Sequence, residues 1–184
     1  QRQMCIRDRN YSLWINGGSQ DVVDCVIEHS YQTGLRYIAS SLVATGPAIE
    51  DNVLTGGSTG LEFVGSAGIQ TAPSISGNQV TGFTSYGLLL TNLEAGSAVS
   101  SNSITDCYRA VYLNAASVAL SANTIGACTY PITILNGSMP TASGNTVAGN
   151  QFQVLVTGGT IASDLTSILP ETIAQVRRAA ATKG

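Results

Sequence analysis

Charged side chains are scarce in this sequence. Asp, Glu, Lys and Arg make up 10% of its 184 residues, where an ordinary soluble domain has about 25%. The formal net charge is -3, the only lysine is Lys183, and the arginines form no stripe. Nucleic-acid-binding surfaces gather Lys and Arg on one face, so we expect no nucleic-acid partner. No apolar run approaches the ~20 residues of a membrane span, so we expect no membrane span either.

Cysteine is also sparse, with four residues in the chain, and this excludes a dense disulfide framework. Cys107 and Cys128 each follow an Asn by five residues, which predicts that they stack in neighbouring coils. Parallel neighbours point the same way, and this disfavours the dihedral angle of a disulfide. We therefore expect a stack of reduced thiols packed as small apolar side chains, with a disulfide as the alternative.

The sequence does contain a repeat in which an aliphatic residue, two further residues, Asn, one residue and another aliphatic residue recur. The intervals are about 21 to 27 residues, which is the period of stacked coils. The copies are Ile49/Asn52/Leu54, Ile75/Asn78/Val80, Val99/Asn102/Ile104, Leu120/Asn123/Ile125 and Ala142/Asn145/Val147. An earlier copy, Val22/Cys25/Ile27, fits if Cys25 takes the place of Asn.

The spacing places each Asn of the repeat directly above the last. Buried amides need hydrogen-bond partners, and stacked amides can supply them from coil to coil. We therefore predict an asparagine ladder with a structural role rather than a set of metal or substrate ligands. Asn150 lies outside this register, so its replacement is expected to be mild.

A second apolar segment follows each Asn position by about nine or ten residues and alternates with period two, as a strand with one buried face does. Its members are Leu35/Tyr37, Leu61/Phe63, Leu88/Leu90, Val111/Leu113, Ile132/Ile134 and Val154/Val156, with Leu13/Ile15 ahead of them. The sequence thus predicts an all-β fold, a single-stranded right-handed parallel β-helix of about six coils over residues 10–158. A leucine-rich repeat has a similar period, but it would place a helix or extended turn where this chain has the alternating strand.

The two ends lack the repeat. Residues 1–9 resemble translated adapter sequence, so we exclude them as a probable non-native scar and expect the native chain to begin upstream, with its N-terminal part missing here. Residues 159–184 are predicted to carry a short C-terminal helix, with Pro170 in its first turn and Arg177 and Arg178 near its end. This helix would cap the last coil; a partner-binding helix is the alternative.

The turns Asn-x-aliphatic and the pairs Gly34-Leu35, Gly60-Leu61 and Gly87-Leu88 give the chain a resemblance to the pectin-lyase-like superfamily of right-handed parallel β-helix proteins. The resemblance covers about Leu13 to Gly158. This superfamily includes polysaccharide lyases, glycoside hydrolases and phage tailspikes. It implies that a polysaccharide lies along the outer face of the long strands, between flanking loops, and that the protein is extracellular, periplasmic or on a cell or virion surface.

On that face the alternation predicts an outward column of one residue per coil. Its members are Trp14, Arg36, Glu62, Leu89, Tyr112, Thr133 and Leu155, and beside them run Asn16, Ile38, Val64, Thr91, Asn114, Leu135 and Thr157. Trp14 and Tyr112 could stack on sugar rings, and Arg36 and Glu62 could bind a hydroxyl or carboxylate. The alternative for Arg36 and Glu62 is an ordinary exposed ion pair of under ~1 kcal/mol.

The loops at residues 39–48 and 65–74 are the longest of their series and are expected to project beside the strands of Arg36 and Glu62. We therefore predict that any carbohydrate contact centres on Trp14, Arg36 and Glu62, with Tyr112 as a further substrate-binding residue. Glu28 and His29, like Asp106, are more typical of solvated turns than of an acid/base pair.

The catalytic motifs of the related enzymes are missing. The sequence has no Gly-His-Gly, no acidic cluster for calcium and no Asp-Pro-His-Glu. We assign no catalytic residue and expect no metal and no cofactor; an enzymatic activity would be that of a polysaccharide lyase or glycoside hydrolase. The sequence thus predicts a carbohydrate-active or carbohydrate-binding β-helix. The alternative is a structural or adhesive solenoid that forms homo-oligomers through its apolar long-strand face.

Overall fold

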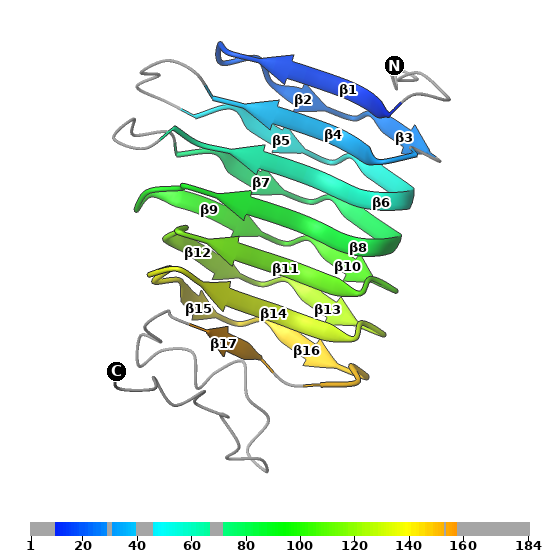
Figure 1. Ribbon diagram of the computed structural model, residues 1–184, viewed down its shortest axis with the longest axis vertical. Coiled ribbons are helices and arrows are strands. Elements are labelled where there is room, and N and C mark those ends of the chain that lie inside the picture. The colour runs from blue at the N-terminus through cyan, green and yellow to red at the C-terminus, as the bar shows by residue number, and fades with distance from the viewer. Residues whose placement is uncertain (1–9, 29–30, 40–45, 67–71, 153, 158–184) are drawn as a thin grey trace, which may run out of the picture.

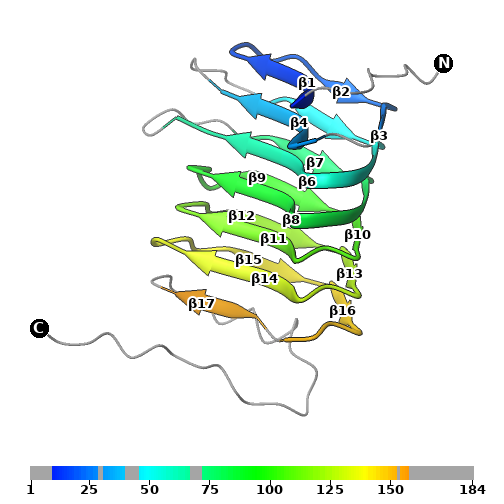
Figure 2. The same ribbon diagram turned by 45° about the vertical axis from the view of Figure 1, so that its right-hand side comes forward.

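A computed structural model of the chain describes residues 10–28, 31–39, 46–66, 72–152 and 154–157. These residues form a rod of stacked coils made only of strands, which descends from the N-terminal coil at the top of Figure 1 to the C-terminal coil at the bottom. All strand pairs between coils are parallel, and the same arrangement is clear from the side in Figure 2. The predicted right-handed parallel β-helix is confirmed.

Each coil contains up to three strands, as the repeat predicts. The first strand of each coil leads into the Asn turn, and these strands form a six-stranded sheet of β2 (Val22–Val23), β5 (Ala48–Glu50), β7 (Ser74–Ser76), β9 (Ser97–Ser100), β12 (Val118–Ser121) and β15 (Thr141–Ser143). The short strand after the turn is seen as β3 (Val26–Glu28), β10 (Ser103–Thr105), β13 (Thr124–Gly126) and β16 (Thr146–Ala148).

The long strands follow the short ones and complete the coil. They are β1 (Tyr11–Asn16), β4 (Thr33–Ile38), β11 (Arg109–Asn114), β14 (Tyr130–Leu135) and β17 (Leu155–Thr157). In two coils the short and long strands fuse into β6 (Val53–Val64) and β8 (Gln79–Thr91), which join both series into one eleven-stranded sheet. Gly56, Gly57 and Gly82 adopt positive φ of 70°, 119° and 78°, which lets the chain bend there without ending the strand.

The core lies inside the coils, where the apolar columns predicted from the alternation stack on themselves. Leu35, Leu61 and Leu88 are at most 1% exposed, and the rings of Tyr37 and Phe63 stack with centroids 4.8 Å apart. A glycine precedes each of these leucines because the backbones of neighbouring coils approach closely there. A Cβ on Gly60, for example, would lie 2.7 Å from the carbonyl oxygen of Gly87. This explains the Gly-Leu pairs of the sequence.

The asparagine ladder is present as predicted. Asn78, Asn102 and Asn123 each accept two hydrogen bonds at Oδ1 from the coil before, and the Nδ2 of each donates to the coil on either side. Cys25 does take the Asn position, where its backbone N–H donates to Asn52 Oδ1 at 2.9 Å. The residue before the ladder side chain is left-handed at Asp51 (φ 55°) and Ala122 (φ 54°), which turns that side chain inward.

A second, shorter ladder contains the predicted stack of Cys107 and Cys128, but its hydrogen bonds and its last member, Asn150, were not predicted. The backbone N–H of Cys107 donates to Cys128 Sγ at 3.4 Å, and that of Cys128 donates to Asn150 Oδ1 at 2.9 Å. Asn150 also donates from Nδ2 to the Ile125 carbonyl at 3.2 Å. Asn150 is therefore unsuited as a mild control site, because it ends the thiol stack and supplies an acceptor to the Cys128 amide.

Cys107 and Cys128 are reduced and stacked, as the repeat spacing predicts. The proposed C-terminal helix, the segment 1–9 and the central parts of the two long loops lie outside the described residues. Within the part of the chain that the structure describes, we find no apolar helix of membrane-spanning length.

Candidate functional site

The outer face of the long strands carries the outward column in the predicted register. Trp14 pairs with Arg36, Arg36 with Glu62, and so on through Leu89, Tyr112, Thr133 and Leu155. The neighbouring column from Asn16 to Thr157 is also in register. The face is not open throughout, because Thr133 points outward by register and is still only 2% exposed.

At the N-terminal end, the structure brings Trp14, Arg36 and Glu62 together with Tyr11; we call these four residues the Arg36 group. Arg36 Nε lies 3.2 Å from Glu62 Oε2 as an ion pair that lacks hydrogen-bond alignment. Arg36 Nη1 donates to the Tyr11 hydroxyl at 2.8 Å. The guanidinium carbon lies 5.2 Å and 6.0 Å from the ring centroids of Tyr11 and Trp14.

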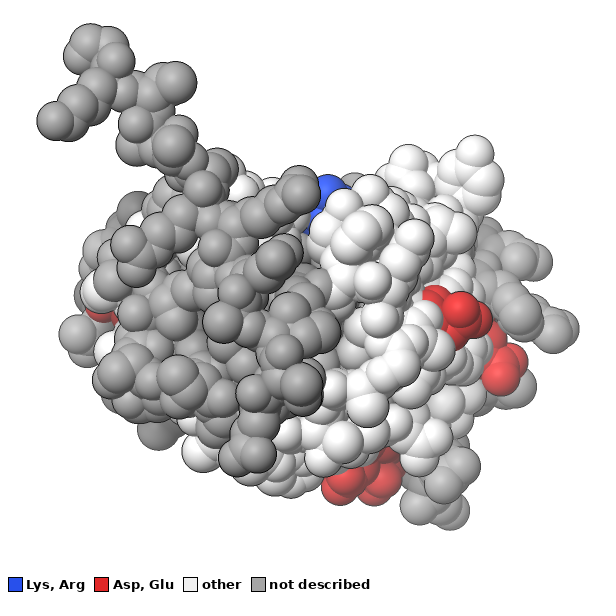
Figure 3. Space-filling view, turned by 90° about the horizontal axis from the view of Figure 1, so that it is seen from below, with Lys and Arg blue, Asp and Glu red and all other residues white. Residues whose placement is uncertain are grey.

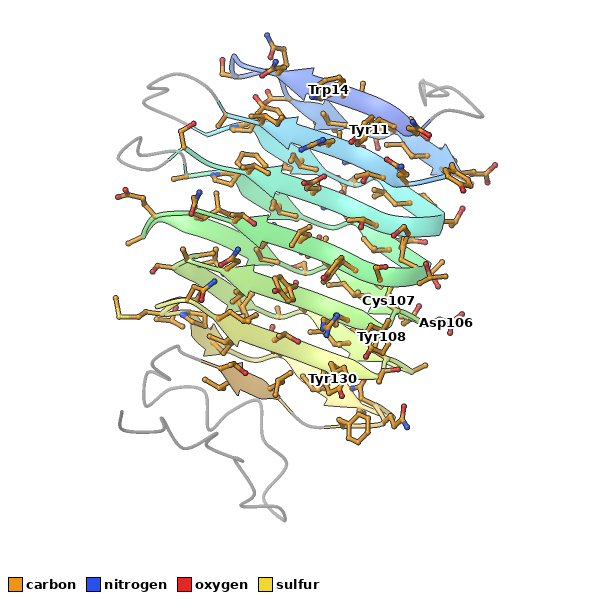
Figure 4. All side chains as sticks on the ribbon, viewed as in Figure 1. Tyr11, Trp14, Asp106, Cys107, Tyr108 and Tyr130 are labelled. Carbon is orange, nitrogen blue, oxygen red and sulfur yellow. The ribbon has the colours of Figure 1, made fainter. Side chains whose placement is uncertain are left out.

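The indole of Trp14 is the most open part of the Arg36 group, with 55% of the residue exposed. Its ring lies 5.5 Å from that of Tyr11 at an angle of 41°, and Figure 4 shows both residues on the uppermost coil. An exposed indole that lies beside a neighbouring ring and an ion pair offers an apolar surface with hydrogen-bonding groups next to it. This arrangement suits a ring-shaped polar ligand.

The fourth predicted residue, Tyr112, belongs to a different cluster. Leu89 separates it from Glu62 in the column, which places it two coils, or about 10 Å, further along the rod. Its ring instead meets that of Tyr86 edge-on at 4.9 Å.

Tyr112 surrounds Arg109 together with Tyr86, Tyr108 and Tyr130, and we call these five residues the Arg109 group. The Arg109 guanidinium carbon lies 4.7 Å from the ring centroid of Tyr108. It lies between 5.6 and 5.8 Å from the centroids of the other three rings. Figure 4 shows Tyr108 and Tyr130 on the lower coils, well apart from Tyr11 and Trp14.

The Arg109 group was missed because its column interrupts the alternation. Arg109 pairs with Tyr86 and Tyr130 in register, and the next residue in each strand is buried at Gly87, Ala110 and Pro131. Two consecutive residues thus face the interior, so counting back by twos from Leu88 assigns Tyr86 to the core. The repeat spacing was the available signal, since Tyr108, Tyr130 and Phe152 follow one another at intervals of 22 residues.

The two groups differ in charge. Glu62 compensates Arg36, whereas no carboxylate lies within 4.0 Å of Arg109 among the described residues. Figure 3, seen from the C-terminal end, shows a small basic area separated from the acidic side chains. Arg36 and Arg109 are the basic residues of the described ranges, so Arg109 is the uncompensated cation there.

Acid/base chemistry finds little support in this part of the chain. Glu28 ends β3, and Asp106 sits in a turn at a positive φ of 54° with its side chain at the rim of the rod. His29 lies outside the described residues. The described residues also hold no group of three His, Cys, Asp or Glu side chains placed to bind a metal ion.

Comparison with known proteins agrees with the architecture. The family model described as the right handed beta helix region matches residues 11–167. No curated protein and no solved structure matches the chain.

Proposed function

Since the chain belongs to the right-handed beta helix family, we propose that it binds an extracellular polysaccharide along the outer face of its long strands. The observation that carries this proposal is the Arg36 group. It combines an exposed aromatic ring with a donor and an acceptor of fixed position on three successive coils. We assign no catalytic residue, so the proposed activity is binding.

The chemistry of the Arg36 group matches that of a sugar. An indole that is half exposed leaves apolar area in water, and stacking against the C–H face of a pyranose removes part of it. Arg36 offers N–H donors and Glu62 offers carboxylate acceptors, which are the partners of sugar hydroxyls. The ion pair holds both side chains in place before the ligand arrives, which lowers the entropy lost on binding.

The spacing along the rod supports an extended ligand. Trp14, Arg36 and Glu62 follow one another in register at steps of ~4.8 Å, which is close to the length of one sugar ring. A glycan chain lying parallel to the rod axis would therefore meet a new side chain at each unit. A partner of this kind is found outside cells, which agrees with the low charge of the chain.

The proposal is tested by replacing Trp14 with Ala and measuring Kd for a panel of soluble polysaccharides by isothermal titration calorimetry. We expect at least a tenfold loss of affinity. Tyr31→Ala is the matched control, because Tyr31 is 79% exposed in the turn between β3 and β4, and its Kd should not change. Binding that is equal in Trp14→Ala and the parent protein, or absent for every polysaccharide tested, would contradict the proposal.

A second candidate is a structural or adhesive solenoid that assembles through the same face. It is favoured by the apolar members of the two outward columns, since Ile38, Val64, Leu89, Leu135 and Leu155 are only partly buried. Exposed apolar patches mark interaction sites. Size-exclusion chromatography with light scattering separates the two candidates: a monomer at micromolar concentration favours polysaccharide binding, and a stable oligomer favours the assembly.

A further inference from the structure

We propose that the Arg109 group is a second subsite, which binds the anionic group of a charged sugar in the polysaccharide. The inference rests on the proposed function for the nature of the ligand chain, and on the Arg109 group for its charge. The geometry behind it is a fixed, uncompensated cation at the open edge of an aromatic wall.

The position of the cation is fixed by rings on three successive coils. Tyr86 lies in β8, Tyr112 in β11 and Tyr130 in β14, and all three centroids lie within 5.8 Å of the Arg109 guanidinium carbon. Tyr108, the residue just before β11, approaches most closely at 4.7 Å. A guanidinium held in this way loses little freedom when it binds a ligand.

The charge of Arg109 is available to a ligand. Aromatic faces attract a cation but do not neutralise it, and the described residues provide no ion-pair partner. Arg109 Nε is buried and has no hydrogen-bond partner there. The partly buried setting also lowers the local dielectric, which strengthens attraction to an anion. A guanidinium fork matches a carboxylate or sulfate better than a hydroxyl, so the ligand group is an oxyanion.

The rings beside the cation remain open to solvent. Tyr108 is 41% exposed and Phe152 is 47% exposed, and Tyr130 lies between them, edge-on to Tyr108 at 5.6 Å and stacked on Phe152 at 4.9 Å. This row of rings forms an aromatic wall, and the Arg109 guanidinium carbon lies 4.7 Å from the ring centroid of its first member, Tyr108. A ring that carries an acidic substituent would stack on the wall and place its oxyanion at Arg109, which describes a hexuronate or a sulfated sugar.

The Arg36 group and the Arg109 group lie on one face. Arg36 and Tyr112 are three coil steps apart in the outward column, or roughly 14 Å, which is about three sugar units. One extended chain can therefore reach both groups. The compensated Arg36 group would hold the chain whatever its charge, and Arg109 would select chains with an acidic unit.

The test uses ligands that differ only in charge. Kd is measured for two pairs of polymers. Polygalacturonate and its fully methyl-esterified form test for a carboxylate, and dextran sulfate and dextran test for a sulfate. The parent protein should bind one charged polymer at least tenfold more tightly than its neutral counterpart, and the preferred pair identifies carboxylate or sulfate. Arg109→Met should remove this preference and leave the Kd for the neutral polymer unchanged.

Two further variants separate this inference from the proposed function. Arg36→Met should weaken binding of charged and neutral polymers alike, because the Arg36 group is already compensated. Arg109→Lys, which keeps the charge between the rings but loses the fork, should retain part of the preference if Arg109→Met fails to fold. Retention of the full charge preference in Arg109→Met overturns the Arg109 subsite while the proposed function stands; absence of binding to any polymer overturns both.

Discussion

The side-chain amide of Asn78 and its own backbone N–H donate to one and the same oxygen, Oδ1 of Asn102, at 2.9 and 3.0 Å. Both residues are 1% exposed, so water cannot replace either bond. Asn102 repeats the arrangement with Asn123 on the next coil. The ladder therefore satisfies backbone groups as well as side chains at each Asn turn.

Asn102→Ala is predicted to lower the free energy of unfolding by ~1 to 3 kcal/mol, because it leaves two donors of Asn78 buried and unpaired. Urea denaturation monitored by circular dichroism measures the effect. Asn114→Ala is the matched control, since Asn114 accepts an exposed hydrogen bond from Asn136, and the loss of such a bond should stay within about 0.5 kcal/mol. Equal stability of the two variants would contradict the structural role of the ladder.

Asn150→Ala is predicted to destabilise the C-terminal coils by about 1 kcal/mol or more, because the Cys128 amide loses its acceptor. Hydrogen exchange at the Cys128 amide should accelerate in this variant. Asn150→Asp keeps an oxygen at the acceptor position and should retain most of the protection. Unchanged exchange in Asn150→Ala would show that the second ladder contributes nothing.

Cys107 and Cys128 are predicted to stay reduced and slow to alkylate in the native protein. Both side chains are buried, with Cys107 4% and Cys128 2% exposed, so a reagent cannot reach either sulfur in the folded state. Hydrogen bonding with Cys128, together with burial, also raises the pKa of the Cys107 thiol, and the thiolate is the reactive form. Mass spectrometry after iodoacetamide treatment without reductant should find both thiols unmodified in the native state and alkylated in urea. A peptide pair linked through the two residues would refute this prediction.

Tyr37 should make stability depend on alkaline pH. Burial raises the pKa of its phenol, and the charge of Asp21 adds to this. An unfolded tyrosine ionises near pH 10, so above that pH the unfolded state binds fewer protons than the native state. The contribution of Tyr37 to the free energy of unfolding is therefore fully present below about pH 10, and it is lost as pH rises through the pKa of the folded state.

Tyr37→Phe should therefore flatten the fall of the unfolding free energy above about pH 10. At neutral pH it should cost about 1 kcal/mol, because the hydroxyl donates to the Gly18 carbonyl at 2.9 Å. Tyr31→Phe, at an exposed position, should leave the pH dependence unchanged. The same alkaline slope in Tyr37→Phe and the parent protein would argue against a titration of Tyr37.

The sequence predicts the coils, the ladder and the outward column because each depends on a spacing that repeats. The Asn of one coil and that of the next must stack, so their interval alone places Trp14 beside Arg36 and Arg36 beside Glu62. The Arg109 group could not be placed in this way. Its position depends on Gly87 and Ala110 turning inward next to Leu88 and Val111, which breaks the period of two that a strand pattern assumes.

The same limit applies to the function. Spacing alone did not distinguish a compensated arginine from an uncompensated one, because Arg36 and Arg109 both face outward on neighbouring columns. The difference arises from what the next coil supplies, which is a carboxylate at Glu62 and an aromatic ring at Tyr130. Only the register of the strands, combined with side-chain contacts, gives the two arginines different roles.

The most direct test of the account is to map a bound glycan onto the rod by NMR. The isotope-labelled protein would be titrated with an oligosaccharide of the polymer that binds most tightly. We predict chemical-shift changes at the Trp14 indole N–H and along β1, β4, β6, β8 and β11, with the strands of the six-stranded sheet unaffected. Changes confined to β2, β5, β7 and β9, or none along the outer face with a ligand that demonstrably binds, would contradict the claim that this face recognises polysaccharide.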